Sequence, residues 1–187
     1  MTRIVCHRHT SWNSGKRGRS VPKPWTDERT NRSGTGLLSL LFSPLVRRYT
    51  VTDIPELIPL IKKNISANVP SAPPSNIVAQ DLDWIVLQST PPTLRPKAFP
   101  FETIDLLLAV DCVYHPSLVN PLVDTMRYLA TPGKTTVVVV VELRADDVIR
   151  EFLEAWLQSD PRWQIWSLGE KRLDSAFALW AGRLQEA

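Results

Sequence analysis

The run LLLAVDCVY, residues 106–114, decides the fold of this chain. Residues 106–110 carry no polar side chain, which is typical of a strand buried on both faces in a parallel sheet covered by helices. The run ends in Asp111, and Tyr114 follows shortly after it. Because ligands bind beyond the carboxyl ends of strands in open α/β sheets, we expect chemistry at this point. The alternative is that Asp111 caps the next helix and Tyr114 packs on its first turn.

Composition limits the class of protein. With 187 residues the chain suits one domain with its own core, and no apolar run approaches the ~20 residues that span a bilayer. Positive charge is concentrated in residues 1–32, which are rich in Arg, Ser, Thr, Asn and Pro. These residues show no helix or strand periodicity, so we expect a disordered basic tail followed by a domain over residues 33–187. Because the basic charge lies in the tail, we expect no nucleic-acid partner, and the lack of a long apolar run predicts no membrane partner.

Cysteine usage indicates the redox setting. Cys6 and Cys112 lie far apart in the sequence, which favours a reducing, intracellular environment. Cys6 with His7 and His9 forms one short cluster without a second ligand pair, and we therefore expect no metal. We also expect a monomer.

Strands and helices alternate from residue 37 onward. The residue patterns predict a helix at 37–42, a strand at 48–53, a helix at 54–69, a strand at 76–81, an exposed Pro-rich connection at 88–100, a strand at 104–110, a helix at 117–129, a strand at 135–141, a helix at 146–158, and two late strands at 163–168 and 176–182. The late strands suit an antiparallel pair. This order predicts a doubly wound α/β sheet.

Two places in this order suit a nucleoside. Gly34 and Gly36 flank a turn before the first helix, where backbone N–H groups can approach a ligand closely. Asp53 ends the next strand, at the spacing typical of an acid that binds ribose hydroxyls. After the strand at 76–81, Asp83 and Trp84 can meet an adenine amino group and the flat face of the base. Packing of Trp84 in the core is an equal alternative.

Asp111 and Tyr114 admit two kinds of chemistry. They can act as an acid/base pair, or the carboxylate can hold a substrate amine while the phenol shapes the pocket. No Gly-Lys-Ser/Thr follows the glycines, and no Ser-His-Asp arrangement is present. His115 is interpreted as a surface or capping residue.

Together these residues resemble the seven-β-strand methyltransferases that use S-adenosyl-L-methionine, and more narrowly the family 16 protein-lysine methyltransferases. The resemblance covers residues 33–183 and rests on SGTGL at 33–37, TVTD at 50–53, LDW at 82–84 and LAVDCVY at 108–114. The Asp-x-x-Tyr motif of the last segment is the most specific. The resemblance implies a Rossmann-like seven-stranded sheet with late antiparallel strands and a protein-lysine N-methyltransferase activity.

The resemblance also assigns roles to residues. The residues implied to bind S-adenosyl-L-methionine are Ser33, Gly34, Gly36, Asp53, Asp83, Trp84 and Val110. Of these, the two glycines would line its methionine and ribose, Asp53 would bind the ribose hydroxyls, and Asp83 and Trp84 would contact adenine. Val110 would line the cleft, and Asp111 and Tyr114 would hold the target lysine.

The resemblance further implies a protein substrate. Members of this family modify translation factors, ribosomal proteins and chaperones, and the fungal members that look most similar act on elongation factor 1-alpha. We therefore expect a cytosolic protein substrate and a cytoplasmic location, with the nucleus as the alternative. No Asn-Pro-Pro-Tyr-like motif follows the strand at 104–110, which argues against methylation of nucleic-acid bases.

One departure from the family pattern bears on activity. The family places an apolar strand ending in Glu-Leu-Gly before the glycine loop, and here Thr30, Asn31 and Arg32 occupy those places. We therefore expect the first strand to be missing, as in a truncated product or a gene model with an unrelated first exon. Losing that strand and its acid predicts weak or no activity. The alternative function is then a catalytically inactive, methyltransferase-like binding module.

Overall fold

A seven-stranded mixed sheet forms the centre of this computed structural model, which describes residues 2–6, 36–68, 76–168 and 176–186. The strands in chain order are β1 (Thr2–Cys6), β2 (Arg48–Asp53), β3 (Ile77–Asp81), β4 (Leu106–Val110), β5 (Thr136–Glu142), β6 (Trp163–Ser167) and β7 (Phe177–Leu184). Their order in the sheet is β3-β2-β1-β4-β5-β7-β6. The first five strands are parallel, and β7 runs antiparallel to β5 and β6. The predictions of a doubly wound α/β sheet with late antiparallel strands are confirmed.

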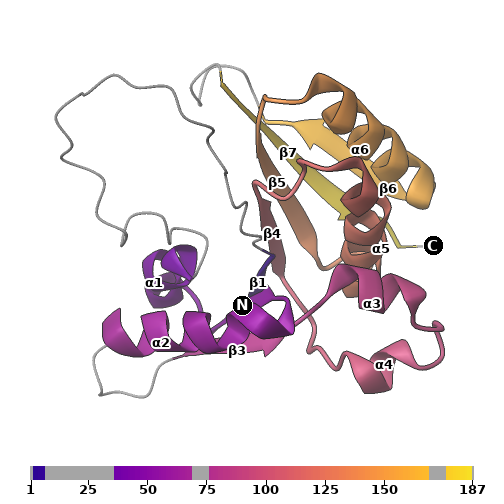
Figure 1. Cartoon of the computed structure of the whole chain (residues 1–187). Helices are drawn as coiled ribbons and strands as arrows, with labels where there is room; N and C mark the ends of the chain where they lie inside the picture. Colours follow the sequence, from indigo (N-terminus) through magenta and orange to yellow (C-terminus); the bar gives the residue numbers. More distant parts are fainter. Residues whose placement is uncertain (1, 7–35, 69–75, 169–175, 187) are drawn as a thin grey trace, which may run out of the picture.

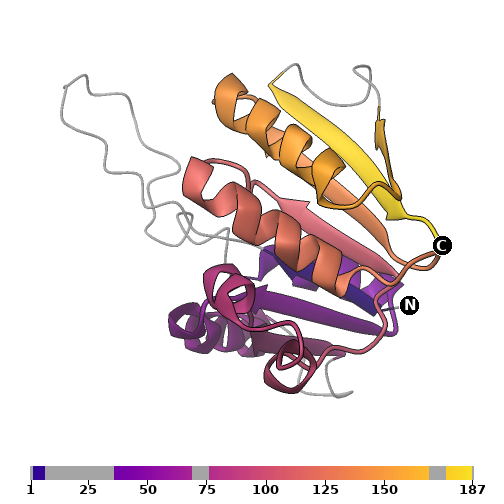
Figure 2. The same ribbon diagram turned by 90° about the vertical axis from the view of Figure 1, so that its right-hand side faces the viewer.

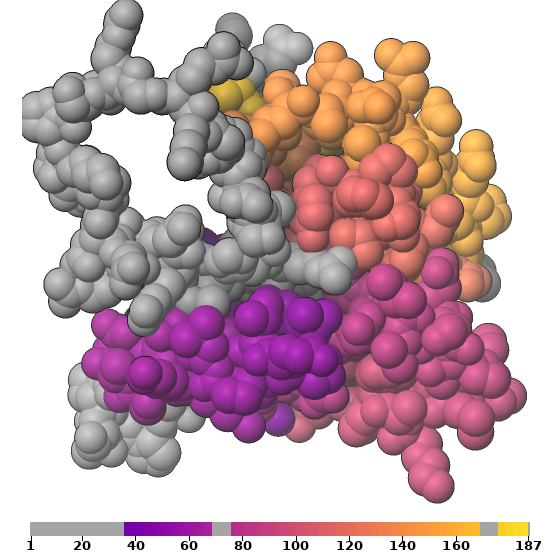
Figure 3. All heavy atoms as spheres, viewed as in Figure 1, coloured from indigo at the N-terminus to yellow at the C-terminus, as the bar shows by residue number. Residues whose placement is uncertain are grey.

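Helices cover both faces of this sheet (Figure 1). They are α1 (Leu37–Phe42), α2 (Ile58–Asn68), α3 (Trp84–Ser89), α4 (Arg95–Ala98), α5 (Val119–Leu129) and α6 (Asp146–Ser159), with short 3-10 turns at Ser43–Leu45, Pro55–Leu57 and Pro116–Leu118. Figure 2 shows α5 and α6 lying side by side across one face, with α1 and α2 behind the sheet. In the space-filling view, α3 and α4 continue the surface directly beneath α5 (Figure 3).

The larger core lies between the sheet and the layer of α3, α5 and α6. The valine run of β5 alternates fully buried Val137, Val139 and Val141 with half-buried residues, as expected for β-branched side chains on a pleated strand. Trp156 of α6 is fully buried, and its ring lies 5.5 Å from Phe152 and 5.7 Å from Trp163, centroid to centroid. This aromatic cluster fixes α6 over the β5–β7–β6 end of the sheet.

The first strand is present, which corrects the expectation that it is missing. The backbone of Thr2–Cys6 pairs with β2 on one side, where Cys6 is opposite Thr52, and with β4 on the other, where Cys6 is opposite Ala109. The polar residues directly before the glycine loop do not reveal this strand, because it lies far upstream of them in the sequence. The rest of the expected tail, residues 7–32, lies outside the described residues.

The Pro-rich connection is more ordered than the sequence predicts. Most of its side chains are exposed, as expected, but it contains α4 and the buried Phe99. Arg95 forms an ion pair of 2.8 Å with Asp124 of α5, and the Tyr128 hydroxyl donates a hydrogen bond of 2.8 Å to the Phe99 carbonyl oxygen. These contacts hold the connection against α5, although its prolines predict only an extended segment.

No helix among the described segments is both long enough and apolar enough to cross a bilayer. Two side chains in the described part of the chain, Asp160 and Tyr128, have pKa values that local contacts shift. Hydrogen bonds from Arg162 hold the pKa of the Asp160 carboxyl well below its usual range, and burial raises the pKa of the Tyr128 hydroxyl.

Proline substitution tests the central place of β1. Val5 pairs with Val51 on one side and with Leu108 on the other. We expect Val5→Pro to lower the free energy of unfolding by at least ~1–3 kcal/mol, because proline removes a ladder hydrogen bond within a central strand and leaves the partner carbonyl without its donor. Val5→Thr is the matched control, since it keeps the N–H and a β-branched side chain. Equal denaturation midpoints by circular dichroism for the two variants would contradict a central β1.

Candidate functional site

The carboxyl ends of the parallel strands meet at one edge of the sheet. Asp53 ends β2, Asp81 ends β3, Val110 ends β4 and Glu142 ends β5. Asp53 and Asp81 are directly paired in the register of the sheet, as are Val110 and Val140. Acidic residues from several strands are thus gathered at the edge where open α/β sheets bind ligands.

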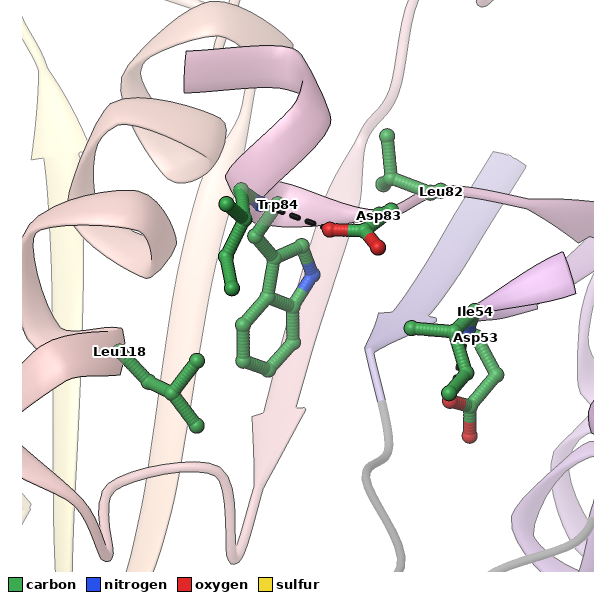
Figure 4. A pocket seen from close by; sticks show the side chains of 7 residues that line it. Asp53, Ile54, Leu82, Asp83, Trp84 and Leu118 are labelled. Carbon is green, nitrogen blue, oxygen red and sulfur yellow. Dashed lines mark hydrogen bonds between the residues drawn. The ribbon is translucent and has the colours of Figure 1, made fainter. Parts of the chain in front are cut away.

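A pocket opens at this edge between β2 and α3. Asp53 and Ile54 lie on one side, and Leu82, Asp83 and Trp84 on the other. The pocket is shallow and partly open to solvent; its other lining residues are Ile85 and Leu118. Figure 4 shows the indole of Trp84 between Leu118 and the pair formed by Ile54 and Asp53. The pocket therefore combines apolar walls with two carboxylates and an aromatic side chain.

Asp53 is held firmly at the end of β2. Only 5% of its surface is exposed. Its Oδ1 accepts a hydrogen bond of 2.8 Å from the Ile54 N–H, and its carbonyl oxygen accepts one of 2.9 Å from the Leu82 N–H. The second bond ties the end of β2 to the segment that follows β3, so the two sides of the pocket are fixed relative to each other.

Asp83 has a structural role as well as a place in the pocket. It is the N-cap of α3. Its Oδ1 accepts a hydrogen bond of 2.8 Å from the Ile85 N–H and one of 3.2 Å from the Val86 N–H. This is the usual way in which a carboxylate satisfies the free N–H groups of a first helical turn. The cap sets the direction in which α3 leaves the sheet, and with it the position of Trp84.

Trp84 packs in the core and also lies beside the pocket. It is 7% exposed and packs in the larger core cluster, and it also lines the pocket. Packing therefore fixes the indole in place, while part of the ring remains at the wall of the pocket.

The glycine loop is described only at its last residue. Gly36 has φ 103°, a conformation that glycine adopts readily, and it begins α1. Its carbonyl oxygen accepts hydrogen bonds from both the N–H and the hydroxyl of Ser39. Gly36 is not among the residues that line the pocket. Ser33 and Gly34 lie outside the described residues.

Asp111 follows the end of β4 and does not cap a helix. Its N–H donates to the Val140 carbonyl oxygen at 2.8 Å, and its φ of 53° lies in the left-handed region, which is uncommon for a residue with a side chain. The cap of the next turn is His115, whose Nδ1 accepts from the Ser117 N–H at 3.3 Å. The interpretation of His115 as a capping residue is confirmed, and the alternative that Asp111 is the cap is wrong.

The side chain of Asp111 forms an ion pair that the sequence did not suggest. Its Oδ2 lies 2.8 Å from Nη2 of Arg144, which comes shortly after the end of β5. Tyr114 and Val110 are partly buried. Neither they nor Asp111 lines the pocket beside Trp84, so the candidate residues form two groups at one edge of the sheet, with β1 between the ends of β2 and β4. A search for charged residues just after each strand would have found Arg144.

A family model and several known proteins are similar to this chain. A family model described as lysine methyltransferase matches residues 32–158, which is more than half of the chain. EEF1A lysine methyltransferase 3 of Xenopus tropicalis is 31% identical over 122 residues, covering 65% of this chain and 49% of that protein. A diaminohydroxyphosphoribosylamino-pyrimidine deaminase of Schizosaccharomyces pombe is 33% identical over 122 residues, covering 64% of this chain and 27% of that protein. The chain spans about half or less of the length of these relatives.

A solved structure with a similar fold is human methyltransferase-like protein 13 in complex with SAH. It superposes with a TM-score of 0.56 at 10% identity, covering 99% of this chain and 72% of that one. At this identity the similarity concerns the fold alone.

The cap made by Asp83 can be tested by stability. We expect Asp83→Ala to lower the free energy of unfolding by ~1 kcal/mol, because the first N–H groups of α3 lose their acceptor. Asp83→Ser is the control, since a serine hydroxyl can accept the same bonds, and it should cost clearly less. Chemical denaturation measures the free energy of unfolding of both variants. Equal losses of this free energy would show that Asp83 does not stabilise the protein by capping α3.

Proposed function

Because the chain belongs to the lysine methyltransferase family, we propose that it transfers a methyl group from S-adenosyl-L-methionine to the side-chain amine of a lysine in a protein. The observation that carries this proposal is the convergence of Asp53, Asp83 and Trp84 on one pocket at the carboxyl edge of the parallel sheet. The sequence assigns the same three residues to a nucleoside, and they come from two different strand ends.

The chemistry of this pocket fits the nucleoside part of the cofactor. Buried Asp53 can accept hydrogen bonds from a ribose diol, because carboxylate oxygens accept strongly from hydroxyl groups. Asp83 can accept from an exocyclic amino group, while Trp84, Leu82 and Leu118 offer apolar and aromatic surface to a flat base. When bound, S-adenosyl-L-methionine supplies a sulfonium methyl group that a neutral amine can take by in-line displacement.

Asp111 and Tyr114 are proposed to receive the lysine. Asp111 stands just after β4 with 38% of its side chain exposed, so an amine can reach it from solvent. Its carboxylate would orient the amine through charge-assisted hydrogen bonds, and the phenol of Tyr114 would shape the entrance. Catalysis would then rest on positioning and on loss of a proton from the lysine, since only the neutral nitrogen has a lone pair to donate.

Elongation factor 1-alpha is the substrate we propose to test first. The name of the Xenopus relative supports this choice, because it states a lysine methyltransferase of EEF1A. A translation factor as substrate implies a cytoplasmic location. We propose that the protein acts as a monomer.

A catalytically inactive binding module is the second candidate. Its main argument was the absence of the first strand, and Thr2–Cys6 now fills the central position of the sheet. What still favours it is the sequence before the glycine loop, where Thr30, Asn31 and Arg32 replace an acid that would hold the methionine amine. The expectation of weak or no activity therefore depends on that acid alone.

Calorimetric titration with S-adenosyl-L-methionine tests the cofactor site. We expect the wild-type chain to bind, and Asp53→Asn to raise Kd ~10- to 100-fold, because a hydrogen bond to a charged acceptor is worth ~1.5–3 kcal/mol. Asp81→Asn is the matched control, since Asp81 is paired with Asp53 in the sheet but does not line the pocket. Absence of binding by the wild-type chain would favour the inactive module.

Transfer of labelled methyl groups into recombinant elongation factor 1-alpha tests the activity. We expect Asp111→Ala to reduce kcat/KM by at least ~100-fold, because the amine loses the group that orients it. Asp105→Asn at the opposite end of β4 should change it little. If both variants keep wild-type activity, Asp111 does not hold the lysine. If the wild-type chain labels no lysine in this factor or in cell extract, the proposed function is wrong.

A further inference from the structure

Arg144 joins two carboxylates beside the proposed lysine site. Its Nη2 lies 2.8 Å from Oδ2 of Asp111 and 2.6 Å from Oε2 of Glu142. One guanidinium nitrogen is therefore shared between the acid that follows β4 and the acid that ends β5. The three residues form a cluster with two negative charges and one positive charge.

Backbone hydrogen bonds hold this cluster in one arrangement. The Asp111 N–H donates to the Val140 carbonyl oxygen at 2.8 Å, which fixes the end of β4 against β5. The Arg144 N–H donates to the Glu142 carbonyl oxygen at 2.9 Å, and the Leu143 N–H donates to the Ala176 carbonyl oxygen at 2.7 Å. The end of β5 is thus bonded to the end of β4, and the turn that carries Arg144 is bonded to the residue before β7.

The cluster contributes little to folding. The exposed fractions of the side chains are 38% for Asp111, 36% for Glu142 and 51% for Arg144. Ion pairs between groups this exposed are weak because water screens them.

We propose that Arg144 is a positioning residue of the methyl-transfer site: it holds the Asp111 carboxylate and offsets the charge of Glu142, so that a lysine amine bound at Asp111 gives up its proton more readily. This inference rests on the proposed function. The other titratable groups close in sequence on the segments that meet here are Cys112, Tyr114 and His115, which follow Asp111, and Asp146 and Asp147, which follow Arg144 at the start of α6.

The direction of the effect follows from the charges. Two carboxylates near an amine favour its protonated form and raise its pKa, whereas a neighbouring guanidinium lowers it. In the transfer step the carbon–sulfur bond breaks, the nitrogen–carbon bond forms, and the amine proton passes to water. An amine with a lower pKa is neutral in a larger fraction of complexes at neutral pH, so Arg144 raises the rate there.

The pH dependence of kcat tests this role, with labelled S-adenosyl-L-methionine and recombinant elongation factor 1-alpha as the substrates. We expect Arg144→Gln to move the rising limb of the profile upward by about 0.5 to 1 pH unit, since a charge within ~4–6 Å can shift a pKa by a unit or more and exposure weakens this effect. Arg144→Lys keeps the charge and should restore the wild-type midpoint. Glu142→Gln removes the opposite charge and should move the limb downward.

The outcomes separate the inference from the function on which it rests. A wild-type enzyme that transfers no label overturns both. Transfer by the wild-type enzyme with an unshifted limb in Arg144→Gln overturns the inference alone, even if kcat falls, because a purely structural role lowers the rate without moving the limb. If thermal melting shows that Arg144→Gln does not fold, Glu142→Gln decides: a downward shift supports the inference and an unchanged midpoint overturns it.

Discussion

The backbone pairing of β1 with β2 and β4 is the constraint on which the rest of the structure depends. Without it the sheet would separate into β3-β2 on one side and β4-β5-β7-β6 on the other. The same pairing sets how far each strand extends, so that Asp53 and Asp111 stand at one edge although they belong to different halves. The proposed cofactor and substrate sites can act together only because this central strand aligns their strand ends.

Most strands of the sheet could be predicted because their own residues have the composition typical of buried strands. The valine run of β5 and the apolar run of β4 are recognisable from composition alone, and both lie where expected. β1 is different, since Thr2–Cys6 is short and sits within a basic, polar stretch. It forms a strand because it pairs with β2 and β4, which are distant in sequence, and the residues of β1 alone do not predict that pairing.

Some contacts of the candidate site could likewise be predicted from local sequence, and others could not. Asp53, Asp83 and Trp84 could be assigned to one pocket because each follows a recognisable strand, and strand ends of a parallel sheet lie together. The contact of Arg144 with Asp111 depends on the register between β4 and β5 and on the turn after β5, which the sequence does not specify. Asp83 shows a third case, in which one side chain caps a helix and lines a pocket, and the sequence indicated only the second role.

The position of β1 also has a consequence for how the chain reaches this structure. Its residue Cys6 meets Thr52 and Ala109, and the second partner lies about a hundred residues further along the chain, a separation that slows folding because a long loop must close first. Until β1 inserts, β2 and β4 each present an unpaired edge that can pair with another copy of the chain. The strand that aligns the two halves of the site is therefore also the point at which folding competes with aggregation.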